Sequence, residues 1–276
     1  MMAGVGQAGP VVVAGAGDVG GRLAARLAGE GTEVLALRRR LPGQVPDGVR
    51  AMAVDLVSGQ GLAALPRQAA ALVFCAAPDQ RDETAYRALY VDGLARLMAA
   101  CEAPRILFVS STAVYAQHRG EWVDERTPAS PVAFNGRVLR QAERLLDGRA
   151  GASTLRLSGL YGPGRTSLIR RALTGDPGSR RWGNRIHVED AAGALAHLLA
   201  LETPAPLYLG SDDLPALDTE VLAWLRETAG QLPVEAPAEG PIQGRRVRNA
   251  ALRATGWQPA YPDYRSGYRP LLGPGV

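Results

Sequence analysis

Short runs of apolar and β-branched residues alternate, over the first two thirds of the chain, with longer Ala- and Leu-rich segments. Such runs, bounded by turn residues, predict buried strands. They are 11–15, 33–37, 50–54, 71–76, 105–111 and 153–158. The segments between them predict helices at 20–29, 81–101 and 135–147. Alternating strands and helices are typical of a doubly wound parallel sheet with helices on both faces, so the predicted fold class is α/β.

The sequence changes in character after residue 160. Loops rich in glycine and proline are followed by predicted helices at 189–201 and 217–229, a short strand at 207–210 and a loop at 230–244. We therefore expect a core over 1–160. The mixed segment 161–276 is expected to complete the sheet and to form a small, interleaved C-terminal substrate lobe.

The first predicted strand leads directly into a glycine-rich turn. Residues 11–28 read VVVAGAGDVGGRLAARLA and place Gly15, Gly17 and Gly20 in Gly-x-Gly-x-x-Gly spacing. In this Rossmann fingerprint the first glycine permits a tight turn, the second lets the main chain approach a pyrophosphate, and the third lets the helix pack on the strand. The helix N-terminus then faces the anion. Together with Asp18 and Val19, the glycines are the predicted binding site of a dinucleotide.

Three arginines, Arg38, Arg39 and Arg40, follow the second predicted strand. A site that prefers NAD usually has an Asp or Glu here, on the ribose 2′-hydroxyl. Guanidinium groups instead favour a 2′-phosphate, which they bind with paired hydrogen bonds. We therefore predict NADP as the cofactor, ahead of NAD. The alternative is that the triplet only covers an exposed turn.

Several further segments resemble the short-chain dehydrogenase/reductase superfamily, most closely its extended and atypical branch, the NAD-dependent epimerase/dehydratase-like proteins. They are VSSTAVYAQ (109–117), RLSGLYGPGR (156–165), RIHVEDAAGAL (185–195) and RRVRNAALRATGW (245–257). The resemblance implies an NAD(P)-binding oxidoreductase or epimerase. It also implies that Asp55 and Leu56 meet the adenine, and that Ala76 and Ala77, which follow Cys75, lie beneath the cofactor.

The catalytic residues of that family are only partly present. The resemblance places Ser111 at the serine that steadies the reacting oxygen. Family members also use a tyrosine as acid or base and, four residues later, a lysine that lowers its pKa. All 31 residues counted as Lys+Arg are arginine, and the alignment puts Asn135 and Leu139 at these two positions. In the same way, 90–93 (Tyr-Val-Asp-Gly) stands where many extended members have Asn-Val-x-Gly.

Two functions remain open without the tyrosine and lysine. Tyr115, Tyr161, or a water held by Ser111 and Asn135 could replace the acid, since a phenol with a pKa near 10 gives up a proton more readily than it takes one and so favours reduction. The substrate would be a carbonyl or nucleotide-sugar-like compound. Alternatively, both tyrosines pack with satisfied hydroxyls, and the chain is an inactive NADP(H)-sensing or scaffold protein.

Other polar residues carry weaker signals. His187 is followed by Glu189 and Asp190 at the start of a predicted helix. Carboxylates in the first turn commonly cap a helix and oppose its dipole, so we expect these residues to have a structural role. Six arginines between 165 and 185 could bind a phosphorylated or nucleotide-linked substrate; they are Arg165, Arg170, Arg171, Arg180, Arg181 and Arg185. His118 and His197 have no ligand-spaced companions, so we predict no metal.

Composition limits the partners and the compartment. The net charge is +4 with a pI near 9.4, but the arginines are scattered, so no nucleic-acid partner is expected. The opening residues lack an export signal, no apolar stretch approaches ~18 residues, and the two cysteines lie in apolar settings without ligand spacing. We expect a cytoplasmic protein that binds a small-molecule substrate, does not enter a membrane and forms a homodimer, as its relatives usually do.

Overall fold

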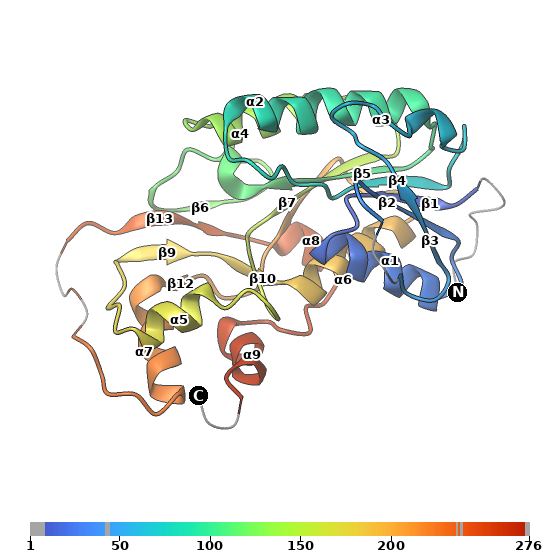
Figure 1. The fold of residues 1–276 in the computed structure, drawn as a ribbon. Coiled ribbons are helices and arrows are strands. Elements are labelled where there is room, and N and C mark those ends of the chain that lie inside the picture. Colours follow the sequence, from blue (N-terminus) through green and yellow to red (C-terminus); the bar gives the residue numbers. More distant parts are fainter. Residues whose placement is uncertain (1–8, 42–44, 236, 238–239, 274–276) are drawn as a thin grey trace. The chain divides into compact units, whose positions relative to one another are not determined.

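The computed structural model describes residues 9–41, 45–235, 237 and 240–273. Most of the opening segment that we inspected for an export signal lies outside them. A seven-stranded sheet has the order β11-β7-β5-β4-β1-β2-β3 (Figure 1). Its strands are β1 (Val11–Ala14), β2 (Val34–Arg38), β3 (Val49–Ala53), β4 (Ala71–Phe74), β5 (Ile106–Ser111), β7 (Ala152–Leu157) and β11 (Leu207–Gly210). All seven predicted strands are therefore present, and the α/β fold class is confirmed.

Parallel pairing explains why these strands are apolar throughout. Strand β1 pairs in parallel with β2 on one side and β4 on the other, and the pairs β2–β3 and β4–β5 are also parallel. Every residue of β1, β4 and β7 is buried. A sheet covered on both faces requires such continuous apolar runs. The chain reverses its winding between β1 and β4, and ligands of open α/β sheets bind at such a point.

Helices cover both faces of this sheet (Figure 1). On one face lie α1 (Asp18–Gly29) and the 192–200 part of α6 (Val188–Ala200), where an added Cβ at Gly193 would lie 3.7 Å from Arg26. The other face carries α2 (Glu83–Tyr86), α3 (Leu94–Ala100) and α4 (Phe134–Arg144). The predicted helix 81–101 is interrupted by a π-helical segment, η2 (Arg87–Gly93), between α2 and α3.

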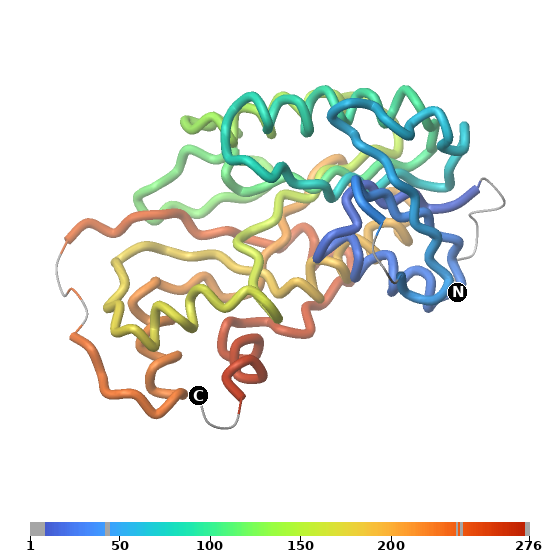
Figure 2. Tube along the Cα trace, in the orientation of Figure 1, coloured from blue at the N-terminus to red at the C-terminus, as the bar shows by residue number. Residues whose placement is uncertain are grey.

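The contacts divide the chain into two compact units that alternate along the sequence. The first comprises the described part of Met1–Val114, together with Ala129–Arg156 and Ala192–Tyr208. The second comprises Tyr115–Pro128, Leu157–Ala191 and the described part of Leu209–Val276. Figure 2 traces the chain from blue to red, so these segments can be followed by residue number. The predicted division into a core over 1–160 and a substrate lobe over 161–276 stays a prediction about which residues bind the cofactor and which bind the substrate.

The second unit contains short elements that the sequence pattern did not predict. A four-stranded sheet has the order β12-β9-β13-β6, and β10 pairs with β8. These strands are β6 (Arg119–Val123), β8 (Gly159–Tyr161), β9 (Arg181–Gly183), β10 (Arg185–His187), β12 (Ala216–Leu217) and β13 (Gln243–Val247). The helices are α5 (Ser167–Leu173), α7 (Asp218–Thr228), α8 (Ala250–Ala254) and α9 (Tyr264–Tyr268). Their core includes Tyr161, Leu222, Leu225 and Tyr268.

Two absences hold for the part of the chain that the structure describes. No helix there combines the length and apolar character needed to cross a bilayer. No group of three or more His, Cys, Asp or Glu side chains is placed to hold a metal ion there.

Candidate functional site

The glycine-rich turn is clamped between the ends of two neighbouring strands. The amides of Gly15 and Ala16 both donate to Leu37 O at the end of β2, at 3.1 and 3.2 Å. On the other side, a Cβ at Gly15 would lie 2.3 Å from the N and Cα of Ala76, just beyond β4. Gly15 also has φ of +89°, a conformation that L side chains rarely adopt. Glycine is therefore required here by both space and conformation.

The other two glycines of the motif differ sharply from each other. A Cβ at Gly20 would lie 2.4 Å from Gly15 O, so α1 packs on the turn as closely as its backbone allows. At Gly17, which is exposed, an added Cβ would meet nothing within 4 Å. Among the described residues no side chain caps the N-terminus of α1, whose first-turn amides carry the positive end of the helix dipole. An open, uncapped helix start fits the pyrophosphate of a dinucleotide.

Asp18 and Val19 form the first turn of α1. The Asp18 carboxylate accepts a hydrogen bond from Arg22 Nε at 2.9 Å, and Val19 is buried. Asp18 therefore belongs to an i,i+4 ion pair along the helix. The aspartate adds to the stability of the helix that would bind the anion, and Val19 anchors that helix to the core.

The arginine triplet lies at the end of β2 and is exposed. Arg39 Nη2 donates to Asp79, with 2.7 Å to Oδ1 and 2.6 Å to Oδ2. No described carboxylate forms an ion pair with Arg38 or Arg40. Two guanidinium groups of the triplet are thus available to a phosphate, and one is already engaged.

The predicted adenine contacts form a turn after β3. Burial alone would raise the pKa of Asp55, but hydrogen bonds from Val57 N and Ser58 Oγ, both at 2.9 Å, hold that pKa below its ordinary value. Leu56 is buried, and its carbonyl oxygen accepts from Arg96. The carboxylate of Asp55 is therefore an ionised acceptor in a fixed loop.

The small residues after β4 lie beside the glycine turn. Ala76 is the residue that Gly15 touches, and Ala77 is exposed next to it. Desolvation raises the pKa of the Cys75 thiol to about 12, so this cysteine is not a thiolate at neutral pH. The alanines leave room at this strand end, and the cysteine offers no nucleophile.

Ser111 ends β5, and its Oγ accepts a hydrogen bond from Ala113 N at 3.2 Å. The start of α4 lies against this segment, because a Cβ at Gly136 would lie 2.4 Å from Ala113 O. Asn135, the residue before it, is half-buried, whereas Leu139 is buried with 4% of its surface exposed. The position of the family's lysine is therefore part of the core.

Both tyrosines considered as replacement acids belong to the second unit and are buried. Tyr115 is 2% exposed, and its hydroxyl donates to Asp124 O at 2.8 Å. The Tyr161 hydroxyl donates to Asp263 O at 3.3 Å, and its ring stacks on Tyr268 at 4.5 Å. Burial raises the pKa of Tyr161. Either hydroxyl would have to give up its carbonyl partner before it could reach a substrate.

A buried ion pair in the first unit escaped the sequence analysis. Arg156 donates to Glu143 through Nε at 2.9 Å and Nη2 at 2.7 Å, and Ser110 Oγ donates to the same carboxylate at 2.6 Å. All three residues are buried. Arg156 opens the segment 156–165 that carries part of the family resemblance, but its guanidinium is engaged with Glu143. The sequence did carry a signal for this pair. Arg156 is a charged residue inside the predicted buried strand 153–158, and Glu143 lies among the apolar positions of the predicted helix 135–147.

The structural role expected for the segment after His187 is supported by its contacts. Asp190 accepts from the amides of Ala260 and Tyr261, at 2.7 and 3.0 Å. The ring of His187 packs on Tyr261, with centroids 4.0 Å apart. These groups fasten the C-terminal segment of the second unit.

The six arginines between 165 and 185 do not act as one cluster. Arg171 forms ion pairs with Asp176 and Asp218, both at 2.7 Å. Arg185 is buried, and Arg180 donates to Gly240 O. Arg170 is exposed on α5. Only part of the set can therefore face a phosphorylated substrate.

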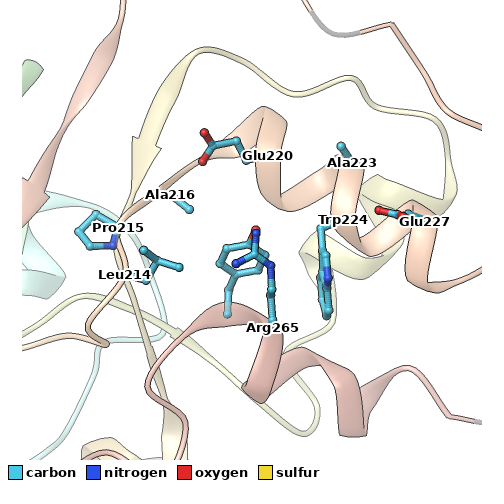
Figure 3. Close-up of a pocket in the computed structure, with 9 residues that line it drawn as sticks. Leu214, Pro215, Ala216, Glu220, Ala223, Trp224, Glu227 and Arg265 are labelled. Carbon is cyan, nitrogen blue, oxygen red and sulfur yellow. The ribbon is translucent and has the colours of Figure 1, made fainter.

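The second unit also has a pocket of about 500 Å³ between α7, α9 and the segment 214–216 (Figure 3). The rings of Trp224 and Tyr264 meet edge to face at 5.5 Å, and Arg265 lies over Tyr264. Its polar lining includes two carboxylates, Glu220 and Glu227. Because one cation stands against two carboxylates, this pocket does not suit a phosphate.

Comparison with known proteins settles the family. Residues 11–207 match the model of the NAD dependent epimerase/dehydratase family. The chain belongs to this family. As an NAD-dependent epimerase/dehydratase family member, it shares its fold with proteins that bind NAD, and the resemblance seen in the sequence is confirmed.

Two solved structures and one curated relative illustrate the family. A protein of Methylobacillus flagellatus assigned to the NAD-dependent epimerases/dehydratases is 37% identical, with 96% of this chain and 97% of that one covered and a TM-score of 0.83. MoeE5, solved with UDP-glucose and NAD, is 26% identical over 94% and 96%, with a TM-score of 0.76. Protein YeeZ of Escherichia coli (strain K12) is 41% identical over 107 residues, which span 38% of this chain and 39% of YeeZ.

Proposed function

We propose that the chain is an NADP-binding oxidoreductase of the epimerase/dehydratase type that acts on a carbonyl or nucleotide-sugar-like compound. The observation that carries the proposal is the uncapped start of α1 beside Gly17, at the point where the sheet reverses its winding. Arg38 supports NADP, because it stands where an NAD site would place a carboxylate. MoeE5, which binds UDP-glucose and NAD, supports the substrate class.

The bound nicotinamide would accept or donate a hydride, and the chain would orient the substrate and move the proton. We assign Ser111 the hydrogen bond to the reacting oxygen, because it ends β5 at the edge of the sheet that carries the glycine turn. Asn135, which precedes the residue that touches Ala113, would hold a proton-carrying water near it. Tyr115 remains a proposed acid, provided that its hydroxyl leaves Asp124 O.

Loss of the tyrosine and lysine slows this chemistry without forbidding it. General acid–base assistance supplies roughly 10²–10⁴-fold in rate, whereas positioning supplies at least as much. We therefore expect a slow reductase. In the first unit, the Ser111 segment, α4 and the glycine turn would supply the positioning that remains.

The proposal is tested by mixing the purified protein with NADPH and a panel of carbonyl compounds, among them UDP-sugars that carry a ring ketone, and following the loss of NADPH absorbance, because the hydride needs a carbonyl carbon to accept it. We expect slow oxidation with at least one member of the panel. The alternative is an NADP(H)-sensing or scaffold protein, favoured by the burial of Leu139 and by the engaged tyrosine hydroxyls. Saturable NADPH binding without any oxidation would support that alternative and reject the oxidoreductase.

A further inference from the structure

Asp79 forms an ion pair across the end of the first strand. It lies in the loop that follows β4, and its partner Arg39 comes directly after β2. Because β2 and β4 flank β1 and run parallel to it, their carboxyl ends lie on either side of the glycine turn. Both oxygens of Asp79 lie within 2.7 Å of Arg39 Nη2. The pair therefore spans the strand end where the proposed cofactor would bind.

This pair distinguishes Arg39 from its neighbours. Arg38 and Arg40 are exposed and have no described carboxylate partner, whereas Arg39 is held by Asp79. In sites that prefer NAD, the carboxylate comes from the end of the second strand. In this chain that position holds Arg38, and a carboxylate reaches the same edge of the sheet from the loop after β4.

We propose that Asp79 is a specificity-determining residue that weakens the preference of this site's arginines for NADP over NAD. This inference rests on the proposed function. With NAD bound, Arg39 stays on Asp79. With NADP bound, Arg39 moves to the 2′-phosphate, so NADP binding has to break the ion pair between Arg39 and Asp79.

The exchange is physically feasible because the pair is exposed. The side chains of Arg39 and Asp79 are 57% and 63% exposed, and such pairs hold together weakly. A phosphate carries more negative charge than a carboxylate and accepts several guanidinium hydrogen bonds at once. Asp79 therefore lowers the affinity for NADP without preventing its binding.

The test is a set of calorimetric titrations of NADP and NAD into the wild type, Asp79→Asn, Arg39→Gln and the double variant. We expect Asp79→Asn to tighten NADP binding about five-fold, the upper range for one exposed pair, and to change NAD binding less than about two-fold. In the Arg39→Gln background the effect of Asp79→Asn on NADP should fall below about two-fold. Glu30→Gln is the matched control, because Glu30 is also exposed but caps the far end of α1.

The outcomes separate this inference from the proposed function. If the wild type binds a dinucleotide but Asp79→Asn leaves the ratio of the NADP and NAD affinities unchanged, the role of Asp79 is rejected and the proposed function stands. The same rejection follows if Glu30→Gln tightens NADP equally, because net charge would then explain the effect. Wild type that binds neither dinucleotide rejects both.

Discussion

At the scale of single residues, the three glycines of the N-terminal turn are needed for different reasons. Gly15 and Gly20 have no room for a side chain, because an added Cβ would lie within 2.4 Å of main-chain atoms of the first unit itself. Gly17 has open space and a φ of −82°. Gly15 and Gly20 are therefore required by the fold, whereas Gly17 leaves open the space that the proposed cofactor would occupy.

The arginines after β2 lead to a prediction about cofactor choice. Replacing both Arg38 and Arg39 with Asp should weaken NADP binding by about 100-fold or more, because two charge-assisted contacts to the 2′-phosphate are lost and replaced by repulsion. Binding of NAD should change by less than about five-fold. Calorimetry measures both affinities, and equal losses for the two dinucleotides would show that these arginines do not bind the phosphate.

Ser111 and Tyr115 lead to a prediction about turnover. Ser111→Ala should lower any reductase activity about 10²-fold while the dissociation constant of NADPH stays within about two-fold, because the serine would act on the reacting oxygen. Tyr115→Phe should lower the reductase activity less than Ser111→Ala does, because the Tyr115 hydroxyl already donates to Asp124 O. A loss as large as that of Ser111→Ala would show that this hydroxyl leaves Asp124 O and acts as the acid. Steady-state rates and NADPH titrations on both variants decide their roles, and full activity in Ser111→Ala would leave that serine without a catalytic part.

At the scale of elements, three neighbours in the first unit are joined by one buried carboxylate. Glu143 on α4 accepts from Arg156 on β7 and from Ser110 on β5, and Ser110 directly precedes Ser111. A buried carboxylate is tolerated only when such partners satisfy it. The network therefore fixes the strand end that carries the proposed catalytic serine, although it lies outside the site.

This network leads to a prediction about stability. Glu143→Leu should lower the free energy of unfolding by about 3–5 kcal/mol, because it removes the carboxylate that balances the charge of the buried Arg156 guanidinium. The double variant Glu143→Leu, Arg156→Met should recover at least half of the loss, since both charges are then removed. Denaturant unfolding measures these values, and additive losses in the double variant would contradict the coupling.

The elements also show what the sequence could and could not predict. The strands and helices of the first unit were found because their burial is periodic and continuous over whole elements, as in β1 and α1. Strands such as β9 and β12 have three and two residues, too few for any alternation to show. The π-helical turn around Tyr90 was missed for a different reason, since its sequence has ordinary helical periodicity.

At the scale of the whole molecule, the chain builds two units from alternating segments. Residues 115–128 belong to the second unit although they precede much of the first, and 192–208 return to the first. The boundary between the units therefore could not be located from the order of residues along the chain. The glycine turn and the absence of the family's lysine could be read from the sequence, because both depend on local residue types. The engaged hydroxyls of Tyr115 and Tyr161 depend on contacts between distant segments, and no local pattern reports them.

The central claim is that the first unit binds a dinucleotide through the start of α1. Calorimetric titration of NADP and NAD into the wild type and Gly17→Leu tests it most directly, because a Cβ at Gly17 would meet nothing within 4 Å in the described residues. We predict micromolar binding to the wild type and a loss of at least about 100-fold, or ~3 kcal/mol, in the variant, with a cooperative melting transition as the check that the variant is folded. Absence of saturable binding to the wild type, or equal affinity in Gly17→Leu, would contradict the claim.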